Sequence, residues 1–184
     1  MPFLGQLWLP IVISTVLVFA LSAASHMVLP WRRNEWGRIT EFEALQKALQ
    51  GLAPGLYAFP AAPDPKEQMK KDWMERWAQG PSGWITLARP GPVSMGKNMA
   101  LSLLVFLLVA CFDAYLASHA LPPAPRFVGV ARMVGTIAFM SFAVAPAFHS
   151  IWYSRPWRAY VSDVIDALIF GLAMAVVFGA LWPR

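Results

Sequence analysis

Four long apolar segments restrict the fold of this chain more than any other feature of its sequence. They run from about Trp8 to Leu29, Met99 to Leu121, Phe127 to Tyr153 and Tyr160 to Trp182. A helix of ~20 residues crosses the roughly 30 Å of hydrocarbon in a bilayer, and helices satisfy their own backbone groups in lipid, as open strand edges do not. We therefore expect an all-α membrane protein, built as a four-helix transmembrane bundle.

The segments divide the chain into one span, an insert and three further spans. Transmembrane helix 1 lies in residues 1–30, the insert is 31–98, and transmembrane helices 2–4 lie in residues 99–184, at about 99–121, 127–153 and 160–182. The whole chain is 58% hydrophobic and 14% charged, whereas a soluble domain carries roughly a quarter charged residues. This composition excludes a soluble enzyme, a disordered tail and a nucleic-acid-binding module.

The basic residues predict the orientation of the spans. Twelve of the 15 Lys and Arg residues lie in the insert or in the loop between the third and fourth spans. Because loops rich in Lys and Arg stay in the cytoplasm, we expect residues 31–98 to be cytoplasmic and both termini to lie outside.

The insert has the pattern of a small α(+β) unit with helices near 41–50 and 65–79. Thr40 and Glu43 have the spacing of a capping box, which would start the first helix. Asp64 followed by Pro65 is typical of the start of the second helix. The short apolar runs at residues 56–59 and 84–87 predict two strands, which are only marginally stable as an isolated ribbon.

Two ionisable residues in the outer half of the bundle are expected to pair. The turn between the second and third spans centres near residues 123–124, and equal steps away from it place Asp113 within one helical turn of Arg132. An unpaired charge in lipid costs several kcal/mol. We therefore expect a structural ion pair between Asp113 and Arg132, with a proton or ion path as the alternative role.

A second polar cluster is expected toward the cytoplasmic ends of spans one, three and four. It consists of His26, His149, Asp163 and Asp166. Imidazoles and carboxylates at one depth would suit a divalent metal, two histidines would suit a haem, and a histidine with a carboxylate would suit a quinone headgroup. Alternatively, the two aspartates balance Arg155 and Arg158, with His149 hydrogen-bonded among them.

Small residues repeat at four-residue steps along the fourth span. Gly171, Ala175 and Gly179 give this helix a smooth face, which permits close contact with another helix. The contact would lie either inside the bundle or with another protein.

Three blocks of sequence flank the predicted cytoplasmic face: His26–Trp31 (HMVLPW), Gly91–Lys97 (GPVSMGK) and Ser150–Trp157 (SIWYSRPW). In these blocks the chain resembles an uncharacterised family of small bacterial inner-membrane proteins. The resemblance covers most of the chain and implies a bacterial inner membrane and four spans. It implies no activity and no functional residue.

The sequence contains no catalytic constellation, so the expected function is non-enzymatic. We expect an accessory or assembly subunit of a larger membrane complex, which contacts membrane lipid and binds protein partners through the fourth span and the insert. One alternative is a metal, haem or quinone site at His26, His149, Asp163 and Asp166. The other is transport of a small solute or protons past Asp113 and Arg132.

Overall fold

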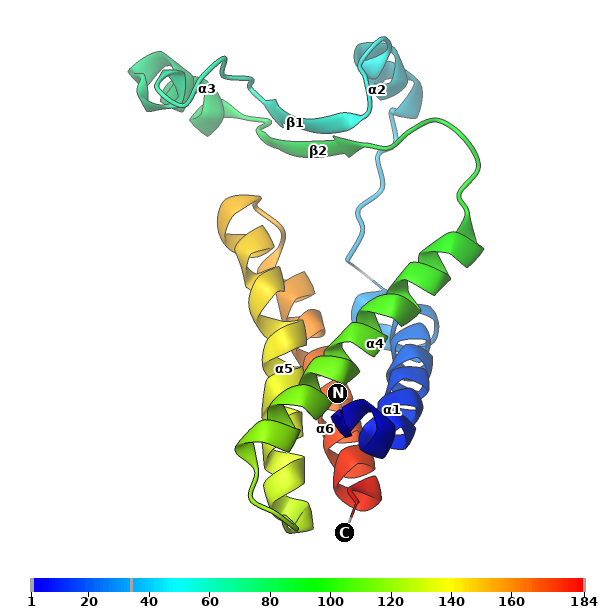
Figure 1. Ribbon diagram of the computed structural model, residues 1–184. Helices are drawn as coiled ribbons and strands as arrows, with labels where there is room; N and C mark the ends of the chain where they lie inside the picture. The colour runs from blue at the N-terminus through cyan, green and yellow to red at the C-terminus, as the bar shows by residue number, and fades with distance from the viewer. Residues whose placement is uncertain (1, 34, 184) are drawn as a thin grey trace.

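Four long helices make up the body of the computed structural model, which describes residues 2–33 and 35–183, apart from the side chains of residues 2 and 3 (Figure 1). They are α1 (Pro2–Met27), α4 (Met95–Ala120), α5 (Phe127–Trp152) and α6 (Trp157–Leu181). All four are long and apolar enough to cross a membrane. The structure thus has the mostly helical fold and the four candidate spans that the sequence predicts.

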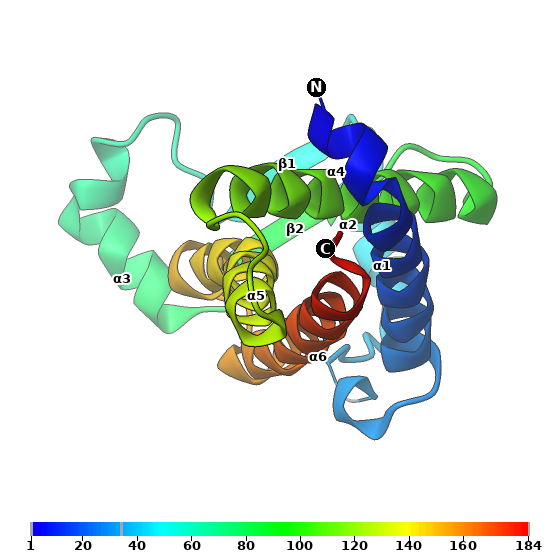
Figure 2. The ribbon, with the colours of Figure 1, turned by 60° about the horizontal axis from the view of Figure 1, so that its bottom comes forward.

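The four helices form a ring in which each contacts two neighbours. Helix α1 packs against α4 and α6, while α5 packs against α6 and α4, and Figure 2 shows this order along the bundle. The helices alternate in direction, so α1 begins and α6 ends at the same end of the bundle (Figure 1). The insert lies at the opposite end, which we call the insert end.

The tightest contact in the bundle is between α5 and α6. A Cβ atom added to Gly171 would lie 3.0 Å from the carbonyl oxygen of Gly135, and one added to Gly135 would lie 3.1 Å from the Cβ of Ala175. A Cβ on Gly179 would meet the ring of Phe127 at 2.7 Å. The small-residue face of the fourth span is therefore occupied by α5, inside the bundle.

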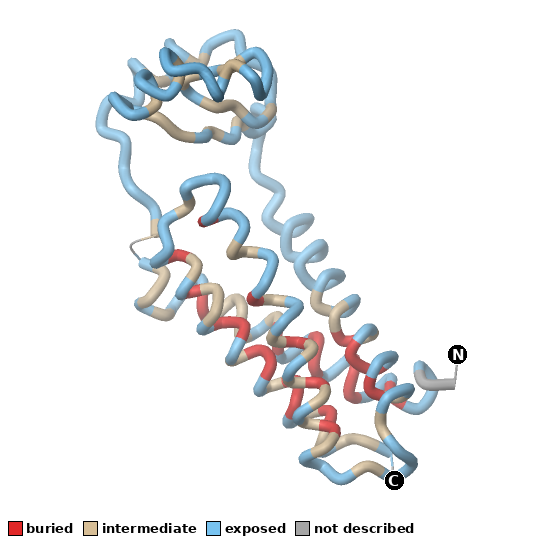
Figure 3. Tube along the Cα trace, turned by 90° about the vertical axis from the view of Figure 1, so that its left-hand side faces the viewer, coloured by how far each residue is buried: buried red, intermediate tan, exposed pale blue. Residues whose placement is uncertain are grey.

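Helix α4 diverges from α5 toward the insert end (Figure 1). Residues 95–105 of α4 are all exposed, whereas Ala110, Ala114 and Ala117 near its other end are fully buried. Figure 3 shows the buried residues gathered within the bundle. The divergence leaves the bundle open between α4 and α5 at the insert end.

The insert contains a ribbon of two strands and two short α-helices. Its elements are α2 (Phe42–Leu49), β1 (Gly55–Phe59), η2 (Glu67–Met69), α3 (Lys71–Gln79) and β2 (Gly83–Leu87), with η2 a 3-10 turn. The strands are antiparallel and pair Ala58 with Trp84, as the two apolar runs predict. None of the described residues of the insert is fully buried.

Two expectations for the insert helices are wrong in detail. Helix α2 starts one residue later than a Thr40 cap requires, and its N-cap residue, Glu41, makes no side-chain capping bond. This shift puts Glu43 at the second helical position, where it does not fit a capping box. The predicted helix over 65–79 is split, because the backbone of Lys70 is extended between η2 and α3. Asp64 is not the N-cap residue of η2, which is Lys66, but its carboxylate accepts from the backbone N–H of Lys66 at 2.7 Å and of Glu67 at 2.9 Å.

Candidate functional site

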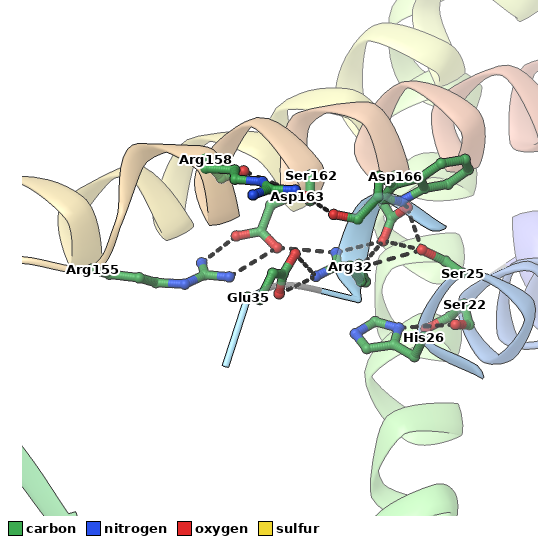
Figure 4. Close-up of polar contacts among 11 residues, drawn as sticks. Ser22, Ser25, His26, Arg32, Glu35, Arg155, Arg158, Ser162, Asp163 and Asp166 are labelled. Atoms are coloured by element: carbon green, nitrogen blue, oxygen red, sulfur yellow. Dashed lines mark hydrogen bonds and ion pairs between the residues drawn. The ribbon is translucent and has the colours of Figure 1, made fainter. Parts of the chain in front are cut away.

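The Asp166 carboxylate is the centre of a polar network at the insert end (Figure 4). Asp166 lies in the third turn of α6 and is 3% exposed. The hydroxyl of Ser25 donates to its two oxygens at 2.6 and 2.8 Å, and the Trp31 indole donates at 3.3 Å. Arg32 donates from Nε at 2.9 Å and from Nη2 at 2.5 Å. Both oxygens of this buried carboxylate thus accept hydrogen bonds.

Arg32 connects Asp166 to two further carboxylates. It donates to Asp163 at 3.1 Å and to Glu35 at 3.2 Å, and Arg155 pairs with the same Asp163. Burial lowers the pKa of Arg32, but the hydrogen bonds and charges of Asp166, Asp163 and Glu35 outweigh it and raise the pKa above its ordinary value. The guanidinium is therefore charged at every physiological pH.

The chain reaches this position through the turn that follows α1. Helix α1 ends at Met27, and Pro30 begins a short 3-10 turn, η1 (Pro30–Arg32). Proline suits the first position of a helical turn because it has no N–H to leave unpaired. The backbone oxygen of Trp31 accepts from Ser162 at 3.4 Å. The turn therefore folds back onto α6 and brings Arg32 between the two helices.

Next to this network lies a cleft with a volume of about 430 Å³. Side chains from all four long helices and from η1 line it. Those of chemical interest are Ser22, His26, Arg32, Phe106, Phe142, His149, Arg155, Asp163, Asp166 and Phe170. The structure thus brings to one cleft all four residues of the cluster expected from the sequence, His26, His149, Asp163 and Asp166.

One wall of the cleft is aromatic. Phe106 of α4, Phe142 of α5 and Phe170 of α6 meet edge to face, with ring centroids 5.4 to 6.1 Å apart. Rings in this arrangement stabilise one another by about 0.5–1.5 kcal/mol per pair beyond their burial. The cleft therefore has an apolar wall opposite charged groups.

The two histidines face the cleft without joining the carboxylates. His26 is exposed, and its Nδ1 lies 2.9 Å from the backbone oxygen of Ser22. His149 is also exposed, and its ring centroid lies 5.8 Å from that of Tyr153. Among the described residues, no group of three His, Cys, Asp or Glu side chains is placed to hold a metal ion. In these positions, the four side chains do not form a coordination site for a metal ion.

The alternative expectation, in which arginines balance the aspartates, holds for one arginine of two. Arg155 pairs with Asp163 as expected. Arg158 contributes only its backbone oxygen, 3.4 Å from the Ser162 hydroxyl, and forms no ion pair with any residue that the structure describes. Arg32, one of the basic residues of the insert that served above only to predict the orientation of the spans, takes the larger role. The sequence signal for this role was Pro30, three residues after the end of α1, which begins the turn that leads the chain back.

The expected ion pair between Asp113 and Arg132 is wrong. Asp113 is fully buried, and neither of its carboxylate oxygens has a hydrogen-bond partner among the described residues. Arg132 is exposed on α5. Counting equal steps from the turn fixes depth but not rotation, and the two side chains lie on different faces. The hypothesis that a small solute or protons pass along Asp113 and Arg132 rested on this expected pair, which the structure does not contain among its described residues.

Comparison with known proteins returns no match. No protein-family model fits the chain, and neither the curated proteins nor the solved structures include one that is significantly similar. The interpretation of the cleft therefore rests on its own geometry.

Proposed function

We propose that the protein is a multi-pass membrane protein that binds a membrane-dissolved amphiphile in the cleft at the insert end. The observation that carries this proposal is the pairing, in one cleft, of an aromatic wall with two exposed imidazoles. A ligand with an apolar tail would enter between α4 and α5, where the bundle is open. Its headgroup would lie near His26 and His149.

The charges near the cleft favour an uncharged headgroup. Arg32 and Arg155 face three carboxylates, those of Glu35, Asp163 and Asp166, so this network has a formal charge of −1. Its arginines are already paired, and a phosphate headgroup would meet a net negative surface. A headgroup with a neutral hydrogen-bond acceptor can instead accept from the His149 imidazole, whereas His26, whose Nδ1–H donates to the Ser22 backbone oxygen, presents Nε2 as an acceptor for a hydroxyl. The ring of an isoprenoid quinone has this chemistry.

The membrane and the orientation belong to the same proposal. The excess of Lys and Arg in residues 31–98 favours a cytoplasmic insert and outer termini, in the inner membrane of a bacterium. The cleft would then open toward the cytoplasmic leaflet, where a quinone could exchange with the lipid.

The test is the quinone content of the purified protein. Protein purified in mild detergent is extracted with organic solvent, and quinones and phospholipids are quantified by mass spectrometry per mole of protein. We expect quinone near one per chain, lowered about tenfold in His149→Ala, since loss of one hydrogen bond of ~1.4 kcal/mol gives that factor. His119→Ala is the matched control, because His119 is exposed on α4 far from the cleft.

Two results would contradict the proposal. The first is a quinone content no higher than that of an unrelated multi-pass protein purified in parallel, which would exclude a quinone as the ligand. Enrichment of a phospholipid, lost in His149→Ala, would mean that the headgroup is anionic or zwitterionic and that the charge argument fails.

A role as an accessory or assembly subunit is the second candidate. It is favoured by large apolar side chains that the insert exposes outside the long helices: Trp36 is 88% exposed, Leu56 77% and Met69 79%. Such side chains are typical of surfaces that meet a partner. Crosslinking in native membranes tests it: with a photoreactive residue at Leu56, a defined adduct is expected, and the absence of any adduct would contradict this role.

A further inference from the structure

The interior of the bundle contains two polar side chains that take no part in the cleft. Asp113 of α4 and Ser14 of α1 are fully buried, each with an exposed fraction of 0%. Among the described residues, neither the carboxylate oxygens of Asp113 nor the hydroxyl of Ser14 has a hydrogen-bond partner. Because buried polar atoms nearly always have a partner, these two side chains mark a candidate binding site.

The two side chains lie at the same depth in the bundle. Leu7 of α1 and Ser118 of α4 line one cavity at the end opposite the insert end, which we call the termini end. Ser14 follows Leu7 by seven residues, about 10 Å of helix. Asp113 precedes Ser118 by five residues, about 8 Å of helix. Since α1 and α4 pack against each other and run in opposite directions (Figure 1), the two residues lie at one level.

Burial shows that both side chains also point into the bundle. Ser14 belongs to a buried stripe on α1, and Asp113 belongs to a buried stripe on α4. The apolar members of these stripes, which pack in one core, are Leu7, Ile11 and Val18 of α1 and Ala110, Ala114 and Ala117 of α4. For Asp113 and Ser14, unlike Asp113 and Arg132, the rotation of the helices therefore agrees with the depth.

The described residues around Asp113 offer it no cation. In the halves of α1, α5 and α6 nearer the termini end, the one charged or titratable side chain described is Arg132, which is exposed on α5. On α4 itself, Tyr115 and His119 are exposed and Cys111 is half-buried. An ionised carboxylate is costly in an apolar interior unless a cation accompanies it. Asp113 therefore needs a bound cation to become neutral.

The small number of oxygen atoms at this level indicates which cation binds. Hard metal ions such as Mg²⁺ and Ca²⁺ take six or more oxygen ligands, whereas Asp113 and Ser14 together supply three side-chain oxygens. A proton needs only one carboxylate oxygen. The acid that it forms is neutral and donates a hydrogen bond, for which the hydroxyl of Ser14 is a suitable acceptor.

The cavity at the termini end offers a source of protons. It has a volume of about 490 Å³ and is lined by the turn after α4 as well as by α1. On the buried face of α4, only the small side chains of Ala114 and Ala117 lie between Asp113 and the end that lines this cavity. The cleft at the insert end lies in the other direction, since Phe106, which lines it, precedes Asp113 by seven residues.

We propose that Asp113 is a proton-binding site, which takes up a proton from water in the cavity at the termini end and holds it beside Ser14. The carboxylate accepts the proton from a hydronium ion and leaves a water molecule, so no further reactant is required. The site is independent of the ligand of the cleft, because neither Asp113 nor Ser14 lines the cleft.

Infrared spectroscopy of the purified full-length protein tests for the bound proton directly. A protonated carboxyl group has a C=O stretching band that is separate from the carboxylate and amide bands. We expect the spectrum of the wild type minus that of Asp113→Asn, both at neutral pH, to contain this band with the intensity of one acid per chain. The band should shift to lower frequency in D₂O, as deuterium replaces the proton. Asp72→Asn, which removes an exposed aspartate of α3, is the matched control and should leave the band unchanged.

A second pair of variants tests the place of Ser14 in the site. Ser14→Ala removes the acceptor beside the acid and is expected to change the frequency of the Asp113 band without removing it. Ser141→Ala is the control, because the Ser141 hydroxyl is exposed on α5 and donates to its own helix at Ile137. Thermal unfolding identifies any misfolded variant. Should Asp113→Asn be misfolded, Asp113→Glu replaces it, since a glutamic acid displaces the band instead of removing it.

The proposal is overturned if Asp113→Asn removes no carboxylic acid band, because the side chain is then ionised. A band that does not shift after equilibration in D₂O would overturn it too, because the proton would not exchange with water. Loss of the wild-type band when Na⁺ replaces K⁺ would mean that the site binds a metal cation in place of a proton. None of these results alters the quinone content of the purified protein, so the two proposals fail separately.

Discussion

Helices α6 and α4 are similar in length and apolar character, yet they use their polar and small residues in opposite ways. In α6, Asp166 is buried and fully paired, and Gly171 is in close contact with α5. In α4, the buried Asp113 has no hydrogen-bond partner among the residues that the structure describes, and residues 95–105 are all exposed. The comparison indicates a rigid side, formed by α5, α6 and the end of α1, and an open side along α4. The cleft exists because the two sides diverge.

The largest expected effect is the loss of Arg32 from the rigid side. Arg32→Ala leaves Asp166, Asp163 and Glu35 without their shared cation. Removing one partner of a buried pair typically costs about 3–5 kcal/mol, so the unfolding temperature in detergent is expected to fall sharply. Arg33→Ala removes an exposed neighbour and serves as the control. Equal stability of the two variants would contradict the network.

A smaller loss is expected where α5 and α6 touch. Gly171→Ala puts a methyl group 3.0 Å from the backbone oxygen of Gly135 and 3.3 Å from the backbone nitrogen of Phe139. Neither backbone atom can move freely, so we expect a destabilisation of about 1–3 kcal/mol, measured by thermal unfolding. Gly129→Ala on α5, whose Cβ would meet nothing within 4 Å, should be neutral or slightly stabilising through helix propensity. If both variants lose stability equally, the close contact is not the cause.

The smallest expected effect concerns the unpaired acid of α4. Asp113→Asn keeps the shape of a side chain whose oxygens accept no hydrogen bond from any described residue, so we expect a change below about 1 kcal/mol. Asp166→Asn weakens the ion pairs with Arg32 and should cost clearly more. Unfolding curves of the two variants side by side make this comparison. An Asp113→Asn loss as large as that of Asp166→Asn would mean that Asp113 has a charged partner.

The sequence alone predicted those features that depend on a single helix or strand. Long apolar runs located the four long helices, and short apolar runs located the strands at 56–59 and 84–87. The depth of His26, His149, Asp163 and Asp166, counted from the ends of their spans, predicted that they lie near one another, and all four line one cleft; that they bind a cofactor stays a prediction. Each of these inferences needs only the length of an apolar run and the rise of a helix.

Features that depend on rotation or on distant segments were not predictable in this way. Arg32 reaches Asp166 across 134 positions of sequence, after a turn whose direction is set by packing on α6. Asp113 and Arg132 have the right depth but the wrong rotation, because the buried face of α4 is decided by its contact with α1. The divergence of α4 from α5 likewise follows from side-chain packing across helices.

The central claim, that the cleft holds a quinone-like headgroup near the two histidines, is tested most directly by photocrosslinking. A short-chain quinone bearing a photoreactive group is bound to the purified full-length protein, and the modified residues are mapped by mass spectrometry. We predict adducts concentrated between Ser22 and His26 of α1 and between Phe142 and His149 of α5, displaced by excess unlabelled quinone. Adducts spread evenly over the exposed faces of the four helices, without displacement, would contradict the account.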